Sequence, residues 1–267
     1  MSERLAVRKT YKLWIGGAFV RSESGRHDRA GDFNIPRASR KDVRDAVAAA
    51  RKAFGPWSAR TAYNRGQILY RAAEALESRA SDLGEPREVE QAIDVLLHYA
   101  GWTDKIAPVL GGVNPVAAPF LSFSLPEPTG VVGVIAPDAP PLLGLVAEIA
   151  PALAAGNTVV AILSDTAPLG GLDLAEALGV SDVPGGVVNL LSGRRSELAP
   201  ALGAHRDLNA IVDASGDSAL AAELDTLAAE TVKRVVRIPD GSDAVDDSLR
   251  RLEGLTELKT AWHPIGA

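Results

Sequence analysis

The run GVVGVIAP, residues 130–137, decides the fold class of this sequence. It is a short, uninterrupted apolar segment, which is typical of a strand buried on both faces of a parallel sheet. Four further strand-like runs follow it, NTVVAIL (157–163), GVVNLLSG (186–193), LNAIVDAS (208–215) and KRVVRI (233–238). A helix-like segment separates each run from the next. This alternation from residue 130 to 238 predicts an α/β domain with a doubly wound parallel sheet and right-handed crossovers.

The segments outside this alternation predict further elements. Residues 12–25 read as a short hairpin that turns at Gly17, and residues 39–54, 62–82 and 84–106 have the apolar spacing of helices. The pair Gly55-Pro56 is expected to close the first of these helices. Their apolar faces are interpreted as core packing. Residues 239–254 predict a turn and one polar helix that only bridge to the tail LTELKTAWHPIGA, which alternates like a strand.

Composition excludes several classes of function. The chain has 267 residues and a formal net charge of −6, which argues against a surface for nucleic acid or anionic membranes. No apolar run reaches the roughly 20 residues needed to cross a bilayer, and the first residues lack the apolar core of a secretory signal. We therefore expect a cytoplasmic protein. Cysteine is absent, and the four histidines lie far apart, so no metal site is expected.

The loops that follow the predicted parallel strands are where a doubly wound sheet binds ligands. None of these loops contains G-x-G-x-x-G or G-x-x-x-x-G-K-[ST]. The nearest approach is SGRRSELAP (192–200), which has a single glycine. Arg194 and Arg195 in this stretch would meet an anion at a helix N-terminus or form a solvated surface, and the sequence leaves both interpretations open.

Several long motifs in the chain resemble the aldehyde dehydrogenase family. EPTGVVGVIAP (127–137), APALAAGNTVV (150–160) and SDVPGGVVNLLSG (181–193) are similar to the motifs of the family's cofactor domain. IGGAFVRSESG (15–25) resembles its opening hairpin, residues 39–58 its first helix, and LTELKTAWHP (255–264) its C-terminal strand. The similarity extends over nearly the whole chain.

The resemblance implies a Rossmann-like scaffold, an oligomerisation hairpin and a C-terminal strand, without the family's catalytic domain. We expect residues 1–116 and 131–253 to form the scaffold, and residues 117–130 and 254–267 to form the hairpin and the tail strand. The block that carries the family's cysteine nucleophile would fall between Ile238 and Leu255, where about sixteen residues stand. Without cysteine, the thiohemiacetal of the family's mechanism cannot form.

The same resemblance marks the catalytic positions as degenerate. Ala139 stands where the family has the asparagine that donates a hydrogen bond to the oxyanion, and Ile238 where it has the general-base glutamate. No catalytic residue is therefore expected.

The cofactor positions differ from the family in the same way. Ile162 and Asp165 replace the lysine and glutamate that hold the adenosine ribose. Ala214 and Ser215 fall in the loop whose glycine approaches the pyrophosphate, and Arg195 replaces a further glycine. Asp213 in the same loop would bring a negative charge near two phosphates. No bound cofactor and no metal are expected, with weak NAD(P) binding as the alternative.

The retained hairpin and tail suggest a role in assembly, because an unpaired edge strand is a template for pairing. We expect the tail to join the sheet of another molecule. The expected interface residues are Phe120, Leu121, Phe123, Leu125, Leu258, Thr260 and Trp262. The chain resembles the non-catalytic second half of family-16 aldehyde dehydrogenases.

Three hypotheses for function remain. The first is a pseudoenzyme that serves as a structural or regulatory partner subunit of a full-length NAD(P)-dependent aldehyde dehydrogenase. The second is a residual NAD(P)-binding oxidoreductase, and it rests on the doubly wound topology alone. The third is a protein that assembles with copies of itself through exchanged tails.

Overall fold

The computed structural model describes residues 9–239, 241–243, 245 and 247–265. Residues 1–8, where the sequence predicts no secretory signal, lie outside the described residues, as do the last two residues of the predicted tail strand. In the described part of the chain, no helix is both long enough and apolar enough to cross a membrane.

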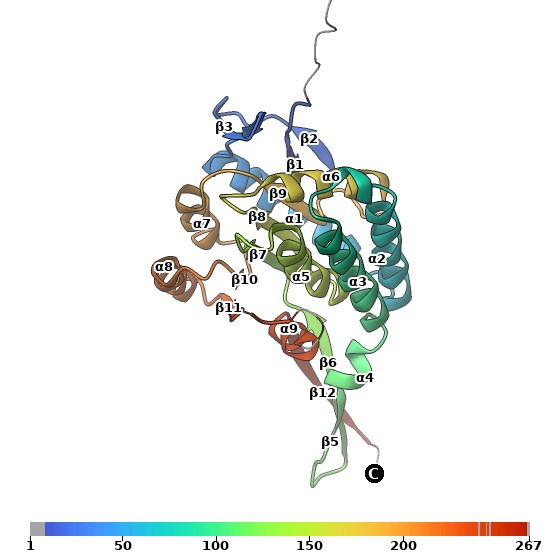
Figure 1. The fold of residues 1–267 in the computed structure, drawn as a ribbon. Helices are drawn as coiled ribbons and strands as arrows, with labels where there is room; N and C mark the ends of the chain where they lie inside the picture. Colours follow the sequence, from blue (N-terminus) through green and yellow to red (C-terminus); the bar gives the residue numbers. More distant parts are fainter. Residues whose placement is uncertain (1–8, 240, 244, 246, 266–267) are drawn as a thin grey trace, which may run out of the picture.

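A seven-stranded sheet runs through the centre of the molecule, in the order β11-β10-β7-β8-β9-β1-β2 (Figure 1). Its five parallel strands are β7 (Val131–Ile135), β8 (Thr158–Ile162), β9 (Val188–Leu191), β10 (Ala210–Asp213) and β11 (Arg234–Arg237). The hairpin of β1 (Leu13–Ile15) and β2 (Ala18–Val20) adds two antiparallel strands beside β9. The predicted doubly wound parallel sheet is therefore confirmed.

Helices cover both faces of the sheet, as five parallel strands require. Every residue of β7, β8, β9 and β10 is buried. On one face, α5 (Pro141–Ala154) and α6 (Leu169–Val180) contact α2 (Ala62–Glu77), and α3 (Pro86–Trp102) packs on α5. On the other face lie α1 (Arg40–Ser58), α7 (Arg195–Gly203) and α8 (Ser218–Ala229). Two apolar cores result, one on each side of the sheet.

The N-terminal helices differ in detail from the sequence expectation. Helix α1 begins after Ser39, whose backbone N–H donates to the Asp42 carboxylate at 2.7 Å, but it does not end at Gly55-Pro56. It continues to Ser58, because the buried Trp57 anchors the last turn in the core. The segment 62–82 divides into α2 and a 3-10 turn (Ala80–Asp82), and residues 84–106 give α3 followed by α4 (Ile106–Leu110). The hairpin of β3 (His27–Ala30) and β4 (Phe33–Pro36) had no sequence signal.

A second, three-stranded sheet projects from the body as an arm (Figure 1). It consists of β5 (Gly112–Asn114), β6 (Phe120–Pro128) and β12 (Thr256–Pro264), in the order β12-β6-β5. The expected hairpin range, 117–130, thus contains β6 but not β5. The sequence analysis did not predict that the tail joins a sheet of its own chain, but β12 pairs with β6 over nine residues. One edge of β12 carries no strand in the described part of the chain.

The segment after β11 packs into the body and is more than a bridge. Helix α9 (Ser248–Gly254) lies against α5 and buries Arg251 and Leu252. Arg251 forms an ion pair with Glu148 of α5, and the two side chains are only 2% and 4% exposed. Burial raises the pKa of Glu148, and the neighbouring Arg251 cation opposes this shift. The polar helix predicted here exists, but its arginine is part of the core.

Replacing Arg251 tests this packing. Arg251→Met should lower the free energy of unfolding by about 3 kcal/mol, because it leaves the Glu148 carboxylate buried without its cation. Urea denaturation measures this change. The exposed neighbour Arg250 provides a matched control, since Arg250→Met should change stability by less than about 0.5 kcal/mol. Equal losses in the two variants would show that the ion pair has no part in holding α9.

Val232 adopts a left-handed backbone conformation, with φ of 54°, in the turn before β11. Its side chain is 92% exposed, so no packing compensates the strain of a β-branched residue there. Val232→Gly should therefore stabilise the fold by about 0.5–1 kcal/mol and raise the melting temperature in a thermal scan. A lower melting temperature would contradict the assigned backbone conformation.

Candidate functional site

The carboxyl ends of the parallel strands form the edge where the sequence places the candidate site. The strand order reverses direction between β7 and β10, so the loops after these two strands diverge and leave a crevice. The loops after β8, β9 and β11 reach the same edge. The residues of this edge fall into an apolar cavity and a cluster of charged side chains.

The apolar cavity brings together three of the degenerate positions predicted from the sequence. Ala139, Ala214 and Ile238 line a cavity of about 340 Å³ between α3, α5 and the loops after β7, β10 and β11. Ala139 and Ile238 carry hydrocarbon side chains, which can neither stabilise an oxyanion nor accept a proton. Glu148 and Arg251 also reach this cavity, but they are paired with each other. Polar side chains of Gln91, Asp94 and Asp243 also line this cavity.

Two other predicted positions lie outside the cavity wall. Ile162 is fully buried at the end of β8 and packs in the apolar core. The backbone N–H and hydroxyl of Ser215 donate to the Asp213 carboxylate at 3.1 and 2.6 Å. In this turn, the polar groups of Ser215 and Asp213 therefore bond to each other.

The charged cluster is built around Arg195, whose residue is only 8% exposed. Its guanidinium contacts both carboxylate oxygens of Asp138, with Nη2 to Oδ1 at 3.0 Å and Nη1 to Oδ2 at 3.2 Å. Nη2 also donates to the Ala136 carbonyl oxygen at 2.8 Å. Arg195 is therefore not the solvated surface residue that one interpretation of the sequence allowed. Its neighbour Arg194 is exposed, as that interpretation expects.

Asp165 and Ser164 complete the cluster. Asp138 Oδ1 accepts hydrogen bonds from Ser164 Oγ at 2.9 Å and from the Asp165 backbone N–H at 3.0 Å. The Asp165 carboxylate in turn accepts the backbone N–H of Arg195, at the first turn of α7, at 2.9 Å. The anion that meets this helix N-terminus thus belongs to the chain itself. The cluster ties together the loops after β7, β8 and β9.

The pKa values of the two carboxylates in the cluster are shifted in opposite directions. Burial disfavours ionisation of Asp138, but the hydrogen bonds from Ser164 and Arg195 outweigh it, and the pKa of Asp138 is lowered. Burial raises the pKa of Asp165, and the nearby Asp138 charge adds to that shift. Asp138 therefore stays ionised and keeps its pairing with Arg195 near neutral pH.

These residues do not fit a dinucleotide cofactor. The resemblance assigns Arg195 and Ala214 to positions where the family's glycines let backbone approach the cofactor, yet the Arg195 side chain now fills that space. The positive charge of Arg195 is neutralised by Asp138, and the start of α7 is already bonded to Asp165. Asp213 adds a third carboxylate nearby. A pyrophosphate would meet these carboxylates, and the Arg195 guanidinium is already paired, although the exposed Arg194 lies beside them.

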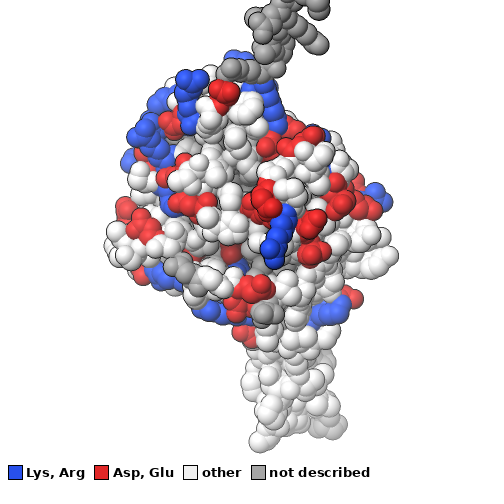
Figure 2. Space-filling view, in the orientation of Figure 1, with Lys and Arg blue, Asp and Glu red and all other residues white. Residues whose placement is uncertain are grey.

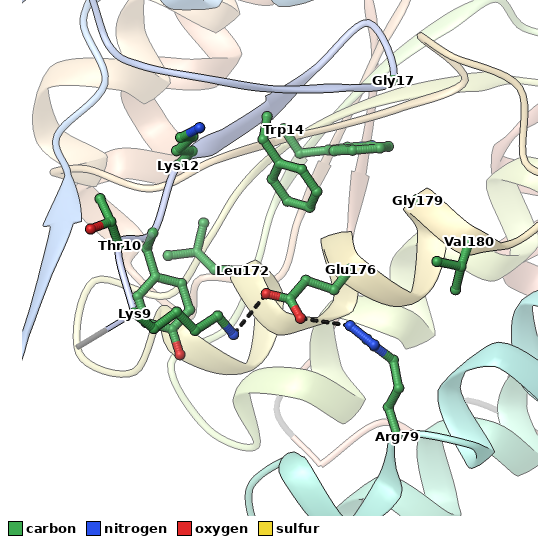
Figure 3. A pocket seen from close by; sticks show the side chains of 12 residues that line it. Lys9, Thr10, Lys12, Trp14, Gly17, Arg79, Leu172, Glu176, Gly179 and Val180 are labelled. Carbon is green, nitrogen blue, oxygen red and sulfur yellow. Dashed lines mark hydrogen bonds and ion pairs between the residues drawn. The ribbon is translucent and has the colours of Figure 1, made fainter. Parts of the chain in front are cut away.

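A different cavity, of about 510 Å³, lies beside β1, β2 and α6 (Figure 3). Lys9 and Arg79 both point at Glu176, each with a nitrogen 2.8 Å from a carboxylate oxygen. Lys9 also pairs with Asp173. Lys9 and Arg79 are thus paired with carboxylates of α6, while Lys12 also lines the cavity.

The arm carries the expected interface residues on both of its faces. Leu258 and Trp262 are each 60% exposed, and Phe120 lies beside Trp262 with ring centroids 6.0 Å apart. Leu121 and Leu125 are exposed on the opposite face, where Phe123 is half-buried. The Thr260 hydroxyl is 2.8 Å from that of Ser124, which faces it across the strands. Most of the arm's length shows no charged side chain in Figure 2.

The sequence analysis missed the partners within these clusters. It did not identify Asp138, Ser164 or Glu148 as members of these clusters. A signal for Glu148 was present, because it is the only charged residue in the apolar run LLGLVAEIAPALAAG (142–156). A lone charge on a buried helix requires a partner, although the sequence does not say which one.

The family model described as the aldehyde dehydrogenase family matches residues 28–245. A putative aldehyde dehydrogenase, DhaS from Bacillus subtilis, is 32% identical over 252 residues, which cover 86% of this chain and 50% of DhaS. Mitochondrial benzaldehyde dehydrogenase from Antirrhinum majus is 34% identical over 74% of this chain and 41% of its own length. The chain thus spans about half the length of the curated relatives it matches.

Solved structures agree with this similarity. PnpE from Pseudomonas sp. WBC-3 superposes with a TM-score of 0.80 at 31% identity, covering 86% of this chain and 50% of PnpE. An aldehyde dehydrogenase from Bacillus cereus, solved as an NAD+ complex, gives a TM-score of 0.79 at 27% identity, covering 91% of this chain and 55% of the other. By its motifs, its fold and these matches, the chain belongs to the aldehyde dehydrogenase family.

Proposed function

We propose that this chain is a non-catalytic aldehyde dehydrogenase homologue that acts as a structural or regulatory partner subunit of a full-length NAD(P)-dependent aldehyde dehydrogenase. The observation that carries the proposal is the arm, with its nine-residue edge strand β12 and exposed apolar side chains on both faces. The arm is the docking element, and the doubly wound domain is the scaffold that carries it.

The degenerate site supports a role without catalysis. The chain has no cysteine to act as nucleophile, and Ala139 and Ile238 supply neither an oxyanion donor nor a base. Relatives of this chain are named as dehydrogenases, but the chain matches only about half of their length. Their activity is therefore not transferred to it.

The shape of the arm supports docking by strand addition. Strand β12 lies at the edge of its sheet, and its side chains Leu258, Thr260 and Trp262 are all exposed. Strand addition gives backbone hydrogen bonds along such an edge, while apolar side chains on the two faces give specificity. An intact family member is the favoured partner because the arm resembles the element through which family subunits assemble. In this proposal, residues 1–116 and 131–253 form the scaffold, and residues 117–130 and 254–267 dock, together with β5.

Co-expression with a full-length aldehyde dehydrogenase of the same organism tests the docking. The two chains should elute as one complex in size-exclusion chromatography at micromolar concentration. The double variant Leu258→Asp/Trp262→Asp should weaken the complex at least about tenfold, because it places charges in a desolvated apolar contact.

Tyr63 of α2 provides a matched control for this variant. It is 73% exposed and lies outside the three-stranded sheet of the arm, so Tyr63→Asp adds the same type of charge and should leave the complex intact. Separate elution of the two wild-type chains would count against the proposal. A homogeneous oligomer of this chain alone, lost on deletion of residues 255–267, would instead support assembly with copies of itself.

Titration with NAD tests the misfit of the cofactor site. The charged cluster predicts no binding tighter than a dissociation constant of about 100 μM, equivalent to roughly −5.5 kcal/mol, in isothermal calorimetry. Arg195→Gly should not restore binding, because Asp138, Asp165 and Asp213 remain. A full-length NAD-binding relative serves as the positive control. Tighter binding by the wild-type chain would favour the alternative of a residual NAD(P)-binding oxidoreductase.

A further inference from the structure

The arm joins the body at its root, where the chain passes through Gly130 and Leu255, and one buried side-chain amide bonds to both of these residues. The chain leaves the arm at Gly130 and returns to it at Leu255, two points that are 125 residues apart but adjacent in space. Asn157, which is fully buried before β8, bonds to both. Its Oδ1 accepts the Gly130 N–H at 2.8 Å, and its Nδ2 donates to the Leu255 carbonyl oxygen at 2.9 Å. Its Nδ2 also donates to the Ala152 carbonyl oxygen of α5 at 3.2 Å.

Arg234 of β11 bonds to the start of β12 at the same root. Its Nη1 donates to the carbonyl oxygens of Thr256 at 2.5 Å and Gly254 at 3.3 Å. Its Nη2 pairs with the Glu257 carboxylate at 2.9 Å. We call Asn157 and Arg234 the root clamp. Together they fix the start of β12 to the central sheet on two sides.

The length of the arm makes the root sensitive to small changes. A nine-residue strand spans about 30 Å at roughly 3.3 Å per residue, so a rotation of about 10° at the root moves the tip by about 5 Å. Backbone hydrogen bonds tolerate only a few tenths of an ångström around 2.9 Å. An arm that pivots would therefore rarely present all of β12 in register with a partner strand.

We propose that Asn157, assisted by Arg234, is a positioning residue that fixes the angle of the arm and thereby pre-organises it for docking. The inference deepens the proposed function and rests on it for the docking step alone. Pre-organisation improves affinity because less conformational freedom is lost on binding. The geometry of the clamp itself can be tested without any partner.

Asn189 offers a matched control within the same chain. It is also fully buried and makes the same three kinds of bond. Its Oδ1 accepts the Gly16 N–H at 2.9 Å, and its Nδ2 donates to the carbonyl oxygens of Val159 at 3.0 Å and Gly186 at 2.8 Å. These bonds hold the β1–β2 hairpin, far from the arm's root in the sheet order. Asn157→Ala and Asn189→Ala should lose similar stability, so any difference between them reports on the arm.

The first experiment measures the arm's angle in the isolated chain. Because the sequence has no cysteine, the changes Leu121→Cys on the arm and Tyr63→Cys on α2 place two spin labels at defined sites. Pulsed electron paramagnetic resonance should give a narrow distance distribution for the parent and for Asn189→Ala. Asn157→Ala should give a broad one. An equally narrow distribution in Asn157→Ala would overturn the inference, whatever the outcome for the partner.

The second experiment measures docking on the full-length partner enzyme. Asn157→Ala should bind it about tenfold more weakly than Asn189→Ala does, because the free arm is no longer pre-organised. Equal affinities would overturn the role of the clamp in docking.

The variants Arg234→Met and Arg237→Met repeat this comparison of binding affinity. Both replace side chains outside the apolar core. Arg237 lies on the same strand but bonds to α8, through the Asp225 carboxylate at 2.7 Å and the Ala221 carbonyl oxygen at 3.0 Å. Only Arg234→Met should weaken docking, and equal losses would contradict the clamp. If the wild-type chain binds no partner, the proposed function fails, while the label distances still decide whether the clamp fixes the arm.

Discussion

Burial of the parallel strands on both faces is the constraint on which the rest of this molecule depends. Strands β7 and β8 have no exposed residue, so helices must cover each side of the sheet and the connections must run over its two ends. The free energy of folding comes from that apolar core. Ala139 and Ala214 lie in loops beyond it. Positions that matter for catalysis elsewhere in the family can therefore change here while the fold persists.

In the charged cluster, side chains of the chain itself bond to one another at the start of α7. Arg195 fills the space at the start of α7 and bonds to Asp138 and the Ala136 carbonyl oxygen, but its Nε is buried without a hydrogen-bond partner. The Arg195–Asp138 ion pair is only partly buried, with the Asp138 side chain 39% exposed, and desolvation of Arg195 offsets part of the attraction. The stronger consequence is geometric. Three loops that would have to accommodate a ligand are instead connected to one another, and Asp165 takes the place of an external anion at the helix.

The sequence predicted the parts of this structure that depend on local pattern. Apolar runs such as 130–137 identify the five parallel strands and the crossovers between them. The family motifs located Ala139, Ala214 and Ile238, which share one cavity. Pairings between distant residues could not be predicted. Nothing near Glu148 indicates Arg251, which is 103 residues away, and the alternation in 255–267 indicates a strand without indicating β6 as its neighbour. The strand character of the tail was predicted, but its pairing with β6 of the same chain was not.

The arm and the degenerate cavity lie at opposite ends of the same sheet. Strand β7 begins three residues after the end of β6 and ends three residues before Asp138, so its five residues separate the two by about 16 Å of buried strand. Asn157 sits at the arm's end of β8, and Asp165 follows β8 at the other end. Asn157, which holds the arm, thus lies at the opposite end of the sheet from Asp165, which connects the loops after β8 and β9. Side chains at the cavity end of the sheet can therefore change while the rigid strands keep the geometry of the arm at the other end.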